Sequence, residues 1–127
     1  MPAEATVICL VDRRKNHLCR RLVAAGFEVV ESYATDQAVA LCVSRDIAAA
    51  VIDEAVFVNN EGWTVARSLK MVRPSTCVLL AMRSHTKPKK LPPHVDALVP
   101  MNRPEQVIAR LREMLGGSTP AASAGSI

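Results

Sequence analysis

The chain has 127 residues, of which 50% are hydrophobic, 22% are charged and only 3% are aromatic, with a formal net charge of +4. This composition excludes a disordered chain, and the length fits one domain with an aliphatic core. The apolar runs are too short for a membrane helix, and the first residues lack a secretory signal, so we expect a cytoplasmic protein. The weak positive charge suits an anionic partner, but the scarcity of aromatic side chains argues against nucleic acid.

Five short apolar runs are spaced along the chain, at residues 6–11, 27–33, 47–52, 77–82 and 96–99. Most of them are continuously apolar, which is typical of strands covered on both faces. The run at 27–33 alternates more between apolar and polar residues, which favours a strand at the edge of a sheet.

Four amphipathic segments of helical period separate these runs, at residues 16–26, 35–45, 62–74 and 102–117. In the last of them, Asn102 and Glu105 have the spacing of a capping box. Such alternation of strands and helices predicts a doubly wound parallel sheet with helices on both faces. After the fourth strand, residues 84–95 contain three prolines and three lysines, so we expect the fourth helix to be short or distorted.

Residues 1–116 form the expected domain, and the small, polar residues 117–127 form an expected disordered tail or linker. The four cysteines are widely spaced within apolar segments and have no CxxC or zinc-like grouping. This pattern favours buried thiols over a metal or redox site; the cysteines are Cys9, Cys19, Cys42 and Cys77.

Three positions at the ends of predicted strands are candidates for a functional site. Ligands of a doubly wound sheet bind at the carboxyl ends of its strands, near the point where the strand order reverses. Asp12 follows the first strand, Asp53 follows the third, and Ala81 lies near the end of the fourth.

Four segments, ICLVDRR, IAAAVIDEAVF, CVLLAM and DALVPMNRPEQV, carry a family resemblance. In order and spacing, the chain from about residue 5 to about residue 115 resembles a bacterial response-regulator receiver domain of the CheY-like type. The resemblance implies a flavodoxin-like, five-stranded sheet of order 2-1-3-4-5. It also implies that Asp53 is the phospho-acceptor and that Mg²⁺ is held by Asp12, Asp53 and the backbone carbonyl of Ala55. Such a metal would neutralise the incoming phosphoryl group.

Four positions depart from the receiver pattern. Arg13 replaces the second acid, Ala81 the phosphoryl-sensing Thr or Ser, Ala97 the switching aromatic residue and Pro100 the lysine. A guanidinium at position 13 repels Mg²⁺, and we predict that Arg13 pairs with Asp53 or Asp12. We therefore expect phosphorylation at Asp53 to be impaired or absent, no catalytic residue and no cofactor, with Mg²⁺ needed only if phosphorylation is retained.

Two basic clusters follow the first and fourth strands, in loops on the carboxyl side of the sheet. They are either solvated loop charge or a site for an anion or an acidic partner. The residues are Arg13, Arg14, Lys15, Lys87, Lys89 and Lys90.

The sequence favours a receiver-like signalling module of a two-component or phosphorelay system that acts through protein–protein interaction and is not an enzyme. Its expected partner is a sensor kinase, another receiver or an output domain. A homodimer is an alternative, and we expect no binding to a membrane. Two alternatives stay open: a functional phospho-receiver with an atypical metal site, and an anion or nucleic-acid binder that uses the basic face. The second of these ranks last, because the chain has no Gly-rich phosphate loop.

Overall fold

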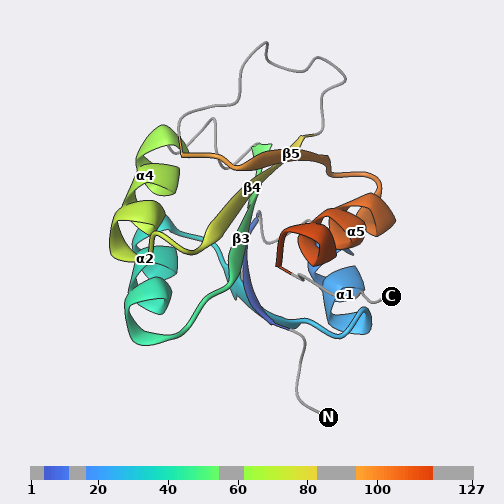
Figure 1. Ribbon diagram of the computed structural model, residues 1–127, viewed down its shortest axis with the longest axis horizontal. Coiled ribbons are helices and arrows are strands. Elements are labelled where there is room, and N and C mark those ends of the chain that lie inside the picture. Colours follow the sequence, from blue (N-terminus) through green and yellow to red (C-terminus); the bar gives the residue numbers. More distant parts are fainter. Residues whose placement is uncertain (1–4, 12–16, 55–61, 83–93, 116–127) are drawn as a thin grey trace, which may run out of the picture.

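The computed structural model describes residues 5–11, 17–54, 62–82 and 94–115. Their strands form one five-stranded sheet of order β2-β1-β3-β4-β5, and every neighbouring pair is parallel (Figure 1). The expected fold class and strand order are therefore confirmed, and β2 lies at an edge of the sheet as its alternating pattern predicted. The strands are β1 (Thr6–Leu10), β2 (Glu28–Ser32), β3 (Ala49–Asp53), β4 (Cys77–Met82) and β5 (Ala97–Pro100).

The helices lie on both faces of the sheet, with α1 and α5 on one face and α2 and α4 on the other (Figure 1). Of the segment expected to hold a short or distorted fourth helix, only residues 94 and 95 are described, so that prediction stays untested. The helices are α1 (His17–Ala24), α2 (Thr35–Ser44), α4 (Gly62–Val72) and α5 (Pro104–Leu115).

Two hydrophobic cores result from the alternation of side chains along the central strands. Odd-numbered residues of β1 and β3 pack toward α1 and α5, whereas even-numbered residues pack toward α2 and α4. Thus Val51 belongs to the first core and Ile52 to the second, and neither is exposed to solvent. Each buried Val, Leu or Ile side chain contributes about 1.5–3 kcal/mol through removal of apolar surface from water. The odd-numbered face of β3 is the one that carries Asp53.

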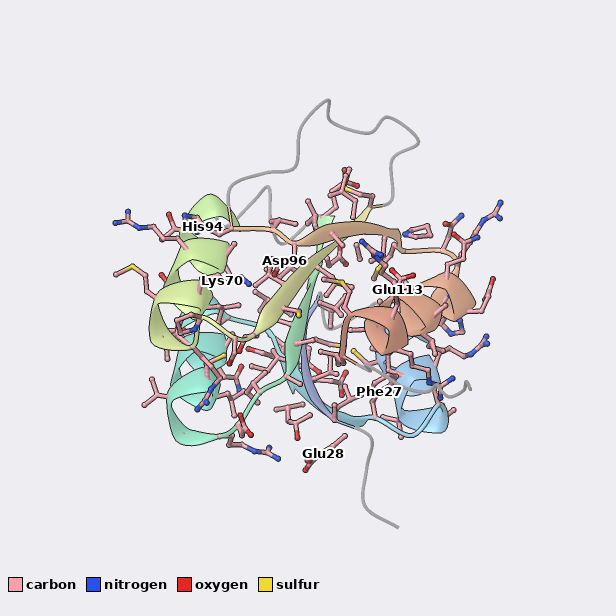
Figure 2. The ribbon with its side chains drawn as sticks, viewed as in Figure 1. Phe27, Glu28, Lys70, His94, Asp96 and Glu113 are labelled. Atoms are coloured by element: carbon pink, nitrogen blue, oxygen red, sulfur yellow. The ribbon has the colours of Figure 1, made fainter. Side chains whose placement is uncertain are left out.

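One ion pair and two hydrogen bonds hold α4 near the amino ends of the strands, opposite the end at which Asp53 lies. Lys70 on α4 contacts Asp96 before β5, with 2.6 Å between Nζ and Oδ2, and Figure 2 shows the two side chains side by side. The same Asp96 oxygen accepts a hydrogen bond from the backbone N–H of Val78 at 2.8 Å. Arg73, after α4, donates from Nε to the carbonyl of Cys42 on α2 at 3.1 Å. These contacts join α4 to β4, β5 and α2.

The start of α5 differs from the sequence prediction. The helix begins at Pro104, so Arg103, and not Asn102, occupies the position before the first helical residue. The Arg103 carbonyl accepts the N–H groups of Gln106 and Val107 at 3.0 and 3.3 Å. The predicted capping box of Asn102 and Glu105 is therefore wrong by one residue, because proline is favoured at the first helical position. Gly116 and the tail lie outside the described residues.

None of the helices in the described part of the chain is long and apolar enough to cross a membrane.

Candidate functional site

Asp53 is the last residue of β3, the central strand of the sheet. All five residues of β3 are buried, and the exposed fraction of Asp53 is 0%. A carboxylate that is removed from water so completely requires compensating hydrogen bonds or charges, since its desolvation costs several kcal/mol. The strand forms here because its sequence, AAVID, is apolar up to the final residue and both of its faces are covered by helices. The acid thus lies where the sequence analysis expected it.

Asp53, Ala81 and Val99 form one row across the carboxyl ends of β3, β4 and β5. Asp53 is in register with Ala81 on β4, and Ala81 is in register with Val99 on β5. Both neighbours are buried, with exposed fractions of 0% and 3%. Neither side chain can donate a hydrogen bond. The side chains of this row on β4 and β5 therefore offer no hydrogen-bond donor to a phosphoryl oxygen on Asp53.

The two other substituted positions on described residues, Ala97 and Pro100, both lie in β5. Ala97 is buried in the core beneath α1 and α5, opposite Leu79 of β4. Pro100 ends β5, is half-buried and is in register with Met82. The structure thus places both residues in β5, whereas the sequence analysis ended the fifth strand at residue 99. Their predicted roles are not tested by these positions.

A polar network at the end of β2 was missed by the sequence analysis. Ser32 is fully buried, and its hydroxyl lies within hydrogen-bonding distance of two acceptors, the carbonyl of Ala34 at 3.1 Å and Oε1 of Gln37 at 3.3 Å. The same Gln37 oxygen accepts the backbone N–H of Tyr33 at 3.3 Å. Gln37 is the third residue of α2, and its side chain accepts the N–H of Tyr33, one residue before the N-cap residue Ala34, and not the N-cap N–H as in a capping box. A serine followed by a glutamine five residues later was the only available signal, and it is a weak one.

Several predicted site residues lie outside the described residues: Asp12, Arg13, Arg14, Lys15, Ala55, Lys87, Lys89 and Lys90. The predicted metal ligands other than Asp53, the pairing of Arg13 with an acid, and the basic face are therefore untested. Within the described ranges, no group of three or more His, Cys, Asp or Glu side chains is arranged to hold a metal ion. Because Asp12 and Ala55 lie outside the described residues, this finding does not test the Mg²⁺ ligands that the resemblance implies.

The cysteines lie mainly in the two cores, as expected: Cys9, Cys19 and Cys42 are buried, and Cys77 is half-buried. Hydrogen bonding to Cys19 and burial raise the pKa of the Cys9 thiol well above its ordinary value, and the nearby carboxylate of Glu31 adds to this effect. A thiol that stays protonated and buried is chemically inert.

Two solved structures share this fold. A response regulator from Thermotoga maritima matches with a TM-score of 0.72 and 17% identity, over 91% of this chain and 98% of the other. A CheY-like protein, TadZ, from Pseudomonas aeruginosa PAO1 matches with a TM-score of 0.67 and 15% identity, over 94% of this chain and 99% of the other. No protein-family model and no curated protein matches the sequence. At these identities, the likeness shows that the chain has the flavodoxin-like fold of CheY-like proteins.

Proposed function

We propose that this chain is a receiver-like signalling module of a two-component or phosphorelay pathway that acts through protein–protein interaction. In this proposal, phosphorylation at Asp53 is impaired or absent, and the chain is not an enzyme. The fold shared with a response regulator and a CheY-like protein supports the receiver part. The observation that carries the second part is the full burial of Asp53 beside Ala81.

The neighbours of Asp53 argue against efficient phosphoryl transfer. Phosphoryl transfer depends on hydrogen-bond donors and cations that stabilise the charge on the transferred group. Beside Asp53, the adjacent strand β4 supplies Ala81, and the next strand, β5, supplies Val99 beside Ala81. The position that the resemblance assigns to a lysine holds Pro100. Removing one such donor from an enzyme site typically costs about 10²–10³-fold in rate, so the combined loss would leave little activity.

The residues that the sequence offers as ligands are also a poor fit for Mg²⁺. This ion requires oxygen ligands, usually one or two carboxylates together with water and phosphate oxygens. The sequence provides Asp12 and Asp53 but has Arg13 in place of the second acid. A guanidinium would compete with the cation for the same carboxylates. We therefore assign no step to a bound metal.

A receiver fold that is not phosphorylated can still bind other proteins, because function on a common fold depends on the particular site and surface. The proposed partners are a sensor kinase, another receiver or an output domain. Under this proposal, the affinity for such a partner should be equal for the wild type and for Asp53→Asn, and acetyl phosphate should not change it.

The direct test is intact-mass spectrometry after incubation of the purified protein with acetyl phosphate and Mg²⁺. A conventional response regulator in a parallel reaction confirms that the phosphodonor is active. We expect no acid-labile phosphoryl adduct on the wild type, and an identical spectrum for Asp53→Asn. A single adduct that the wild type gains and Asp53→Asn lacks would overturn the proposal in favour of a functional phospho-receiver with an atypical metal site.

A further inference from the structure

We draw no further inference here: the strongest candidate, the cluster of Cys9, Cys19 and Glu31 between α1 and the sheet, carries nothing because it rests on a raised Cys9 pKa, which keeps the thiol inert, and on one buried Glu31 carboxylate oxygen, and no group of three or more such side chains among the described residues is arranged to hold a metal ion.

Discussion

At the scale of single residues, three polar or charged side chains are buried within the otherwise apolar interior of the described ranges: Ser32, Asp53 and Thr76. Buried polar groups are tolerated when hydrogen bonds replace the water that they lose. Ser32, at the end of β2, hydrogen-bonds to the carbonyl of Ala34. Thr76, just before β4, hydrogen-bonds to the carbonyl of Ile47. Their roles are structural, whereas Asp53 lies at the carboxyl ends of the strands, where proteins with doubly wound sheets bind their ligands.

Thr76 gives a clear test of such a buried hydrogen bond. Its hydroxyl donates to the carbonyl of Ile47 at 2.8 Å and is fully buried. Thr76→Val keeps the shape of the side chain but leaves that carbonyl without this donor, so the free energy of unfolding should fall by about 1–3 kcal/mol. Urea denaturation measures the change. Thr64→Val, the same substitution at an exposed position of α4, should change it by no more than about 0.5 kcal/mol. Equal effects at both positions would contradict the assignment.

The raised pKa of the Cys9 thiol predicts a loss of stability at alkaline pH. Below about pH 8.5, the ordinary cysteine pKa, folded and unfolded chains both keep the proton, so Cys9 adds no pH dependence. Above it, the unfolded chain loses the proton while the folded chain retains it, because Cys19, burial and Glu31 raise the folded pKa. The free energy of unfolding should therefore fall by up to about 1.4 kcal/mol per pH unit from this group.

Urea denaturation under reducing conditions between pH 7.5 and 9.5 tests this slope. Cys9→Ala should flatten the alkaline decline, although it also lowers stability at every pH by removing buried atoms. Val7→Ala removes buried atoms from the same strand and core without removing a thiol, so it should keep the wild-type slope. Parallel slopes for wild type and Cys9→Ala would show that Cys9 titrates normally in the folded chain.

At the scale of the elements, the pattern of apolar residues was sufficient to predict the strands and helices of the described ranges. The run predicted at 77–82 coincides with β4, and the others differ from the observed strands by one or two residues at their ends. Continuous apolar runs are informative because both faces of this parallel sheet are covered. Boundaries such as the start of α5 depend on local hydrogen bonding, which hydrophobic period does not encode.

The contacts of Asp96 join three elements, and the sequence did not reveal them. One carboxylate oxygen of Asp96 forms an ion pair with Lys70 of α4 and accepts a hydrogen bond from the N–H of Val78 in β4. Asp96→Ala removes both contacts and leaves the Val78 N–H without that acceptor, so we expect a loss of about 1–3 kcal/mol. Asp96→Asn keeps an acceptor and should lose less.

A second acid provides the matched control. Asp46 pairs with Arg73 at 3.4 Å, but its side chain is 97% exposed. Exposed ion pairs contribute little, so Asp46→Ala should lower the free energy of unfolding by no more than about 0.5 kcal/mol. Urea denaturation of Asp96→Ala, Asp96→Asn and Asp46→Ala gives the ranking. If Asp46→Ala were as harmful as Asp96→Ala, the contact with the Val78 N–H would not be the reason for the effect.

At the scale of the whole molecule, the sequence predicted the sheet order and the position of Asp53, because the family resemblance extends in order and spacing from about residue 5 to about residue 115. The register adds what the sequence could not: Ala81 directly beside Asp53, and Val99 beside Ala81. The full burial of Asp53 was also not predictable, since it depends on how the other elements pack against the end of β3. The described ends of β3, β4 and β5 therefore have the arrangement of the fold, and Ala81 differs from the receiver pattern in its side chain.

If phosphorylation at Asp53 is impaired, as we propose, because of the substituted side chains, then restoring those side chains should allow it. The variant Arg13→Asp, Ala81→Thr, Pro100→Lys returns the second acid, a hydroxyl in the row beside Asp53 and a cation at the end of β5. Intact-mass spectrometry with acetyl phosphate and Mg²⁺ should show an acid-labile adduct absent from the wild type. The adduct should disappear when Asp53→Asn is added to the same variant.

A matched control separates restored chemistry from a change in the core. Ala97→Thr in place of Ala81→Thr puts the same side chain into the same buried core, but opposite Leu79 and not beside Asp53, so it should give no adduct. Either threonine adds volume to a packed interior at a cost of about 1–3 kcal/mol, and circular dichroism checks that both variants fold. A folded triple variant that takes no phosphoryl group would contradict the side-chain explanation. The cause would then lie in the backbone around Asp53, which those substitutions leave unchanged.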